Sequence, residues 1–231
     1  MNQEVATPTS DLGSWLRERL QQPMPPEEVR ARFAPSLSYG RHFGPPAHDA
    51  RHAAVLILFY AHDNRWFVPF TMRPETMLAH AGQISFPGGM VEPGETSADA
   101  AARELEEEIG VPASAVGILG CLSPLNVFVS NYLVVPWVAV ARGPITFRPC
   151  QREVAEVLEM PLTHLLDAGN YGVHPYRRGE LEFSAPHVAW GNYRVWGATC
   201  IILAELVAIL AELPRGALEP TTGLSAPPGD V

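Results

Sequence analysis

Residues 89–111 read GMVEPGETSADAAARELEEEIGV and contain the clearest helix signal in the chain. Thr96 or Ser97 can cap the start of a helix, because both hydroxyls can accept hydrogen bonds from its first free N–H groups. Gly110 ends such a helix, since glycine readily adopts the left-handed backbone conformation that follows a helix. This stretch predicts a helix over residues 96–109, with its alanine, leucine and isoleucine side chains packed on a sheet.

Three glutamates of this helix share one face. Glu104, Glu107 and Glu108 are spaced i, i+3 and i+4, which brings side chains together when each residue turns the helix by about 100°. Like charges at this spacing destabilise a helix by about 0.2–0.5 kcal/mol per pair. The face is therefore either a solvated acidic surface or a site for a hard divalent cation, whose charge would remove the repulsion.

Strand-like segments surround the helix. Residues 53–60 form a continuous apolar run, which is typical of a strand covered on both faces. Asp63-Asn64 predicts a turn that leads into a hairpin partner at residues 66–72. Further strands are expected at residues 83–86, 116–122, 132–140 and 153–159, and further helices at 10–20, 26–33, 162–166 and 195–213. The last of these helices is expected to be amphipathic. Strands flanked by two long helices indicate a mixed α/β fold.

Changes in composition divide the chain into three parts. Residues 1–45 contain two short predicted helices and many prolines and are expected to form an N-terminal helical arm. Residues 46–213 hold the predicted strands and both long helices and are expected to form the main domain. Residues 214–231 are rich in Pro, Gly, Ser and Thr and are expected to form a disordered tail.

The charge balance excludes several functions. The chain has 16 basic and 25 acidic side chains, a net charge of −9, and every basic residue is arginine. The absence of lysine excludes a P-loop lysine, a Schiff-base lysine and a pyridoxal-phosphate anchor. Because no basic stripe is available to neutralise phosphates, the chain is not expected to bind nucleic acid.

The cysteines and the hydropathy indicate a cytoplasmic protein. Cys121, Cys150 and Cys200 are widely spaced and form no CxxC pair, which argues against a disulfide framework and against a zinc site. No apolar run approaches the roughly 18 residues of a membrane span. The first residues lack the apolar core of a secretory signal, so we expect a cytoplasmic location with no membrane partner.

The helix and the loop before it resemble the Nudix box, G-x5-E-x7-R-E-U-x-E-E-x-G-U, in which U is aliphatic. Every constrained position is matched, by Gly89, Glu95, Arg103, Glu104, Leu105, Glu107, Glu108, Gly110 and Val111. The resemblance implies the Nudix-type α/β/α sandwich with a mixed sheet. It also implies metal-dependent hydrolysis of the pyrophosphate bond of a nucleoside diphosphate linked to another moiety.

The same resemblance implies roles for individual residues. The expected ligands of Mg²⁺ or Mn²⁺ are Glu104, Glu107, Glu108 and the backbone carbonyl of Gly89. Glu95 and Arg103 complete the expected catalytic set, where they would pair and hold the loop against the helix. Glu95 is therefore expected to have a structural role and not to act as a base.

Residues 71–89 resemble the coenzyme A pyrophosphatase signature, L-L-T-x-R-[SA]-x3-R-x3-G-x3-F-P-G-G. The matching residues are Thr71, Arg73, Gly82, Phe86, Pro87, Gly88 and Gly89. The resemblance implies coenzyme A or a derivative as the substrate, with Arg73, His80 and Phe86 as candidate substrate-binding residues. Leu78 stands where the signature has its second arginine, a natural partner for a phosphate group.

Several of these residues have a second interpretation. Arg73 could equally be a surface arginine that pairs with Glu75 or with solvent, and His80 could be a structural loop histidine. Glu153 and Glu156 lie where Nudix enzymes often supply a late carboxylate as metal ligand or base. The alternation of polar and apolar residues in that segment fits a solvated strand face as well.

Aromatic residues near the C-terminal helix also have two readings. Trp190, Tyr193 and Trp196 could stack on adenine, although aromatic residues at this spacing are more typical of a core or a dimer interface. The sequence leaves open whether the chain forms a homodimer.

Two alternatives to the coenzyme A assignment remain. The same chemistry could act on ADP-ribose, a dinucleotide or another nucleoside diphosphate conjugate, so the expected partner is a small nucleotide conjugate in each case. A Nudix-fold ligand sensor without turnover is a further alternative. Three mutually repelling glutamates on one face argue against a sensor, which would have no need to keep them.

Overall fold

A computed structural model of the protein describes residues 11–38, 41–75 and 82–214. Its helices are α1 (Asp11–Arg19), α2 (Glu27–Ala31), α3 (Ser97–Ile109), α4 (Leu162–Leu166) and α5 (Ala198–Leu210), with 3-10 turns η1 (Ser36–Ser38), η2 (Arg41–Phe43), η3 (Ala113–Ala115) and η4 (Ala168–Asn170). Its strands are β1 (Arg51–His62), β2 (Arg65–Met72), β3 (Ile84–Ser85), β4 (Gly88–Met90), β5 (Val116–Cys121), β6 (Leu125–Val127), β7 (Tyr132–Ala141), β8 (Glu156–Pro161), β9 (Tyr171–Arg178), β10 (Leu181–Trp190) and β11 (Tyr193–Trp196).

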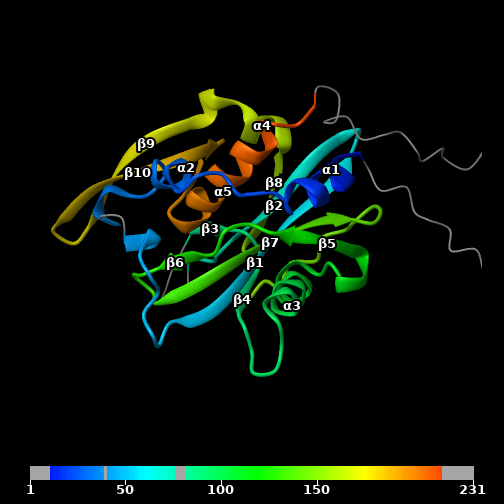
Figure 1. The fold of residues 1–231 in the computed structure, drawn as a ribbon, viewed down its shortest axis with the longest axis horizontal. Helices are drawn as coiled ribbons and strands as arrows, with labels where there is room; N and C mark the ends of the chain where they lie inside the picture. The colour runs from blue at the N-terminus through cyan, green and yellow to red at the C-terminus, as the bar shows by residue number, and fades with distance from the viewer. Residues whose placement is uncertain (1–10, 39–40, 76–81, 215–231) are drawn as a thin grey trace, which may run out of the picture.

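Within the described residues, eight strands form one mixed sheet whose main order is β3-β2-β1-β7-β5. β1 and β7 run parallel, whereas β4 pairs with β1, β6 with β7 and β8 with β2 in antiparallel fashion. Helix α3 covers one side of this sheet, and α5 lies on the other side together with the three-stranded sheet of β9, β10 and β11 (Figure 1). The expected mixed α/β architecture is confirmed.

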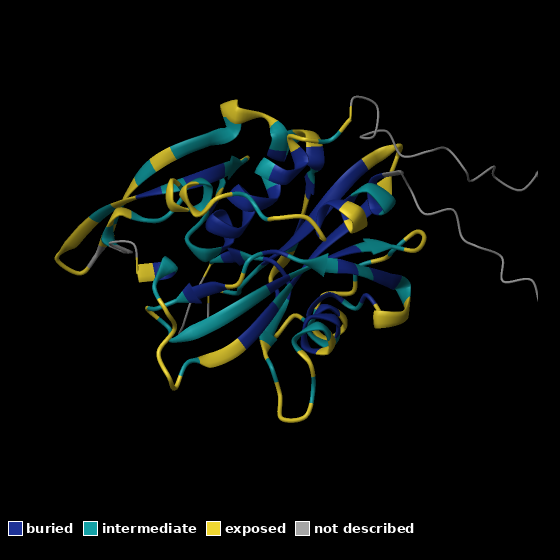
Figure 2. Cartoon of the chain, in the orientation of Figure 1, coloured by how far each residue is buried: buried dark blue, intermediate teal, exposed yellow. Residues whose placement is uncertain are grey.

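Strand β1 is buried on both of its faces. Ala54, Leu56 and Leu58 belong to the core beneath α3, whereas the alternate residues Ile57 and Phe59 belong to the core beneath α5. This placement explains the unbroken apolar run, because a strand between two layers has no solvent-exposed face. Figure 2 shows the burial concentrated in these central strands and in α5.

The turn between β1 and β2 has the predicted hairpin form. Asp63 and Asn64 both have positive φ, 46° and 55°, which is the backbone geometry of the tight turns that join twisted antiparallel strands. The register that follows pairs Tyr60 with Phe67.

The region after residue 150 differs from the expectation in two respects. The strand expected at 153–159 begins only at Glu156, because Glu153 lies in a turn whose N–H bonds to the carbonyl of Cys150. The sheet of β9, β10 and β11 was not predicted. Pro175 and Pro186 lie within β9 and β10, and proline weakens a strand signal because it cannot donate a ladder hydrogen bond.

Helix α5 is shorter and more buried than expected. It begins at Ala198, because residues up to Trp196 belong to β11 and Gly197 forms the junction with φ 69°. Its side chains are buried almost all round, including Leu203 and Ala204, so the helix is not the amphipathic one that was predicted. Such a helix lies inside the core and not on its surface.

The N-terminal segment packs on the main core. Leu12, Leu16 and Leu20 of the α1 region are buried in the cluster that contains α5. Arg19 forms a 2.7 Å ion pair with Glu212, which connects this segment to the turn that follows α5. The division into an arm, a main domain and a tail remains a prediction. No helix among the described residues is long and apolar enough to cross a membrane.

Candidate functional site

Helix α3 has well-defined ends, which fix the direction of its glutamates. The Thr96 side chain accepts a hydrogen bond from the Asp99 N–H, and the Asp99 carboxylate accepts one from the Thr96 N–H. At the other end, Gly110 adopts the left-handed conformation with φ 72°. Both ends agree with the sequence prediction, because each depends on residues within one turn of the boundary.

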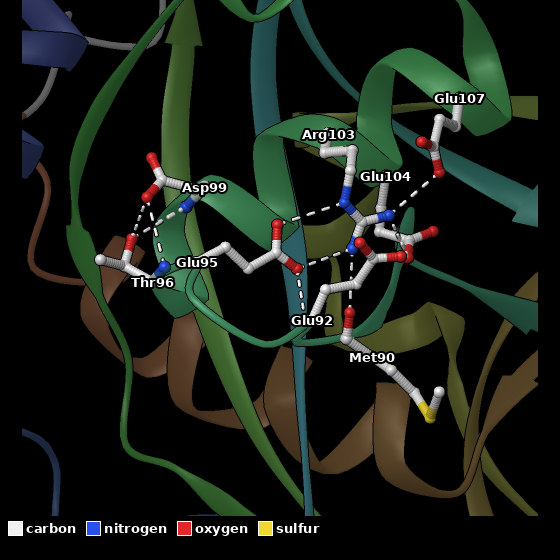
Figure 3. Close-up of polar contacts among 8 residues, drawn as sticks. All are labelled: Met90, Glu92, Glu95, Thr96, Asp99, Arg103, Glu104 and Glu107. Atoms are coloured by element: carbon white, nitrogen blue, oxygen red, sulfur yellow. Dashed lines mark hydrogen bonds and ion pairs between the residues drawn. The ribbon is translucent and has the colours of Figure 1, made fainter.

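Arg103 joins the helix to the loop that precedes it (Figure 3). Its guanidinium donates to both carboxylate oxygens of Glu95, at 2.9 and 3.2 Å, and to the carbonyl of Met90 at 2.9 Å. It also donates to Glu104 at 2.9 Å and to Glu107 at 3.0 Å. The expected contact between Glu95 and Arg103 is therefore present, and the same arginine neutralises part of the acidic face.

Glu108 is the buried carboxylate of this face, with 4% of its surface exposed. It accepts a hydrogen bond from the Gly88 N–H at 3.3 Å. Burial raises the pKa of Glu108 to about 7; the Gly88 bond and the charge of Arg73 oppose this shift, and Glu104 and Glu153 add to it. A carboxylate in this environment would gain from a cation that takes the place of its proton.

Glu104 lies between the buried and the exposed parts of the face. Burial raises its pKa, the contact with Arg103 opposes the shift, and the charges of Glu107 and Glu153 add to it. Glu107 is the outermost of the three predicted ligands, with 58% of its side chain exposed. Among the described residues, no group of three His, Cys, Asp or Glu side chains is already arranged to hold a metal ion. Arg103 contacts both Glu104 and Glu107.

The two glycines before the loop allow close contacts that a side chain would prevent. A Cβ atom on Gly88 would lie 2.3 Å from the carbonyl oxygen of Ala54 in β1. A Cβ atom on Gly89 would lie 2.2 Å from a carboxylate oxygen of Glu104. The backbone of β4 therefore runs directly against the acidic face, where the Gly89 carbonyl was expected to act as a ligand.

The two candidate late carboxylates have different surroundings. The charge of Glu153 raises the pKa of both Glu104 and Glu108, so this turn residue lies near the acidic face. Glu156 instead accepts a 2.7 Å hydrogen bond from the hydroxyl of Tyr193. Of the two candidates that the sequence could not separate, Glu153 is the one that lies near the acidic face.

A pocket of about 380 Å³ opens beside the acidic face. Arg73 and Gly88 line its end near Glu108, and Phe86 forms part of its wall while stacking on Phe70 with ring centroids 4.8 Å apart. The volume lies within the range of small-molecule sites. Two further residues singled out in the sequence, Leu78 and His80, lie outside the described residues.

Most of the pocket wall was not found from the sequence. It combines Leu37 of η1, Phe128 after β6, Phe183 of β10, Trp196 of β11 and Thr199 of α5. These residues come from five separate segments, and none carries a motif by itself. A partial signal was present at Trp196, which had been considered for stacking on adenine.

Comparisons with known proteins identify the family of the chain. The NUDIX domain model matches residues 50–176, more than half of the chain. The uncharacterized Nudix hydrolase NudL of Escherichia coli O6:H1 is 39% identical over 172 residues, which cover 71% of this chain and 85% of the relative. NudL of Shigella flexneri is 38% identical over the same shares of both chains.

One similar solved structure covers a larger part of this chain than the NudL relatives do. A MutT/nudix family protein from Enterococcus faecalis is 17% identical and covers 80% of this chain and 73% of its own, with a TM-score of 0.48. The NUDIX domain match at residues 50–176 contains the whole of α3 and the loop before it. The chain therefore belongs to the Nudix hydrolase family, whose enzymes are pyrophosphohydrolases that act on nucleoside diphosphate derivatives and generally use divalent metal ions.

Proposed function

We propose that this chain hydrolyses the pyrophosphate bond of coenzyme A or of a coenzyme A derivative. The observation that carries the proposed hydrolysis is the buried carboxylate of Glu108, which lies beside the Gly88 N–H and near Arg73 at one end of a largely apolar pocket. A charged pyrophosphate suits this end, and an uncharged part of a nucleotide conjugate suits the remainder of the pocket.

We assign the binding of Mg²⁺ or Mn²⁺ to Glu104, Glu107, Glu108 and the Gly89 carbonyl. The donor set suits these ions, because both prefer carboxylate, carbonyl and water oxygens. The close approach of the Gly89 backbone to Glu104 also supports the assignment, since a side chain there would occupy the space between them. Glu107 would have to share its carboxylate with Arg103, which now contacts it.

A bound divalent cation would neutralise charge on the pyrophosphate and lower the pKa of a water molecule. The protein residues would orient these groups. Arg103 and Glu95 hold the loop at a fixed distance from α3, and Arg73 places a positive charge at the pocket end that would receive the phosphates. Glu153 is our candidate for the late carboxylate, because its charge reaches both Glu104 and Glu108.

The assignment of coenzyme A rests on the signature-like segment that ends at Gly89. Three of its matched residues, Arg73, Phe86 and Gly88, line the pocket. The segment as a whole is similar to the coenzyme A pyrophosphatase signature. Its departures are Leu78, Pro69-Phe70 in place of the leucine pair and Pro74 in place of the small residue.

A substrate panel tests the proposal. The purified protein is incubated with coenzyme A, dephospho-coenzyme A, ADP-ribose and a diadenosine polyphosphate, each with Mg²⁺ or Mn²⁺, and products are identified by mass. We expect coenzyme A and its derivatives to have the highest kcat/KM and to release 4′-phosphopantetheine. Faster cleavage of ADP-ribose or of the dinucleotide would overturn the coenzyme A assignment, and saturable binding without turnover would favour a sensor.

A further inference from the structure

The pocket beside the acidic face is largely apolar, with a few polar groups and one charged residue in its wall. Of the described residues that line it, Arg73 is the one with a permanent charge. It lies close enough to Glu108 to lower the pKa of that residue. The other walls include the side chains of Phe128, Phe183 and Trp196. A ligand that fits this distribution has its phosphates at the Arg73 end and an uncharged group farther inside.

The aromatic residues favour a flat ring as that uncharged group. The indole of Trp196 is backed by Tyr176, with ring centroids 4.3 Å apart and planes inclined by 25°. The ring of Phe183 lies 6.1 Å from the same indole. Aromatic side chains bind nucleobases by stacking, which contributes about 1–3 kcal/mol per base. A flexible aliphatic arm would gain no comparable advantage from rings held in this way.

His42 adds a directional polar group to the pocket wall. Its Nδ1 lies 2.9 Å from the backbone carbonyl oxygen of Asn126, and a carbonyl oxygen can only accept. Nδ1 is therefore the protonated ring nitrogen. Burial lowers the pKa of His42, so the ring is neutral near pH 7 and Nε2 keeps its lone pair. The ring also contacts Phe128 edge-on, at 5.1 Å between centroids, which restricts its orientation.

We propose that this pocket binds the adenine ring of the substrate, with Nε2 of His42 accepting a hydrogen bond from the exocyclic amino group and with Phe128 and Trp196 as aromatic walls. The inference rests on the proposed function, since it assumes a nucleotide conjugate as ligand. Adenine is common to coenzyme A, ADP-ribose and the adenine dinucleotides. The group on the far side of the pyrophosphate, pantetheine in coenzyme A, then lies outside the pocket.

Equilibrium binding of ADP and IDP by calorimetry tests this assignment without any need for turnover. The two nucleotides differ at the base, where IDP has a carbonyl oxygen in place of the amino group. An acceptor would then face the Nε2 acceptor, so we expect the wild-type protein to bind ADP about tenfold more tightly than IDP. Equal dissociation constants for the two nucleotides in the wild-type protein would overturn the assignment.

A His42→Asn variant identifies the residue responsible. The asparagine amide can still donate to the Asn126 carbonyl, but it has no group equivalent to Nε2. We expect its ADP affinity to fall until ADP and IDP bind alike. A variant that keeps the full preference for ADP would show that another group reads the base.

Fluorescence provides a second measurement. We expect ADP to quench the emission of Trp196, and the Trp196→Phe variant to lose that component of the quenching. Trp190→Phe is the matched control, because Trp190 packs against His164 and does not line the pocket. Quenching of Trp196 by 4′-phosphopantetheine but not by ADP would assign the pocket to the other half of the substrate and overturn the proposal. Absence of hydrolysis would contradict only the proposed function, since ADP binding does not depend on it.

Discussion

The guanidinium of Arg103 makes two hydrogen bonds to the two carboxylate oxygens of Glu95, at 2.9 and 3.2 Å. These bonds lower the pKa of Glu95, as does the bond that Glu95 accepts from the Glu92 N–H. The paired geometry fixes the orientation of both side chains. The loop that leads from Gly89 to α3 is thereby held against the helix that carries the acidic residues.

We expect Glu95→Gln to retain measurable activity. The substitution removes the charge from the pair with Arg103 but keeps one acceptor oxygen, so the loop should be held less firmly. The melting temperature should fall slightly, and kcat/KM should fall far less than in a variant that loses a metal ligand. Thermal melting and steady-state kinetics check this. A well-folded Glu95→Gln protein without activity would mean that Glu95 has a chemical role.

Glu108→Gln should nearly abolish turnover and leave the fold intact. Glutamine has the same volume but no negative charge, so the expected loss is that of metal binding. Addition of Mg²⁺ or Mn²⁺ should raise the melting temperature of the wild-type protein and not that of the variant, because a ligand that binds only the folded state stabilises it. Without metal, the variant should be at least as stable as the wild type, since it no longer places a carboxylate charge in a buried position.

A matched control for this experiment is Glu106→Gln on the same helix. Glu106 is exposed and accepts a hydrogen bond from the Ala113 N–H, away from the acidic face. It should behave as the wild type in activity and in its response to metal. Glu104→Gln should resemble Glu108→Gln in activity. Full activity in either of these two variants would contradict the assigned metal site.

Gly88→Ala and Gly89→Ala should fail in different ways. The added methyl group at position 88 would meet the backbone of β1, 2.3 Å from the Ala54 oxygen, which cannot move aside without separating two strands. The methyl group at position 89 would meet the end of the Glu104 side chain, which can rotate away. We therefore expect a large loss of stability in Gly88→Ala, and a folded protein with impaired metal binding in Gly89→Ala. Thermal melting with and without Mg²⁺ distinguishes the two, and equal losses of stability would contradict this account.

Glu153→Gln and Glu156→Gln form a second matched pair. Glu153 acts electrostatically on Glu104 and Glu108, whereas Glu156 is engaged by Tyr193. Activity should fall strongly in Glu153→Gln and stay near the wild-type value in Glu156→Gln. Measurement of kcat/KM for the two purified variants decides the matter, and the reverse order would assign the late carboxylate to Glu156.

The substrate preference should reflect Leu78 in place of the signature arginine. A charge-assisted hydrogen bond to phosphate contributes about 1.5–3 kcal/mol, so its loss would weaken recognition by roughly ten- to a hundredfold. We expect poor discrimination between coenzyme A and 3′-dephospho-coenzyme A, and a selective rise in kcat/KM for coenzyme A in Leu78→Arg. A wild-type enzyme that strongly prefers coenzyme A, with no response to Leu78→Arg, would contradict this account of specificity.

Local features of the chain were predictable from the sequence. Helix α3, its cap at Thr96 and its end at Gly110 depend on contacts within one turn, and the β1–β2 hairpin depends on two adjacent turn residues. The Nudix box could also be found, because its residues lie within one continuous segment. Strand β1 was predicted with both faces covered, since its apolar residues do not alternate with polar ones.

Only the tertiary structure decided how distant segments meet. Glu153 and Glu156 are equivalent in the sequence pattern, yet a turn brings the first to the acidic face while Tyr193 engages the second. The sheet that contributes Phe183 and Trp196 to the pocket has prolines within its strands, and His42 reaches the same pocket from the other end of the chain. Periodicity reports only whether a residue is buried, whereas the neighbours of a buried residue depend on how the sheets and helices pack together.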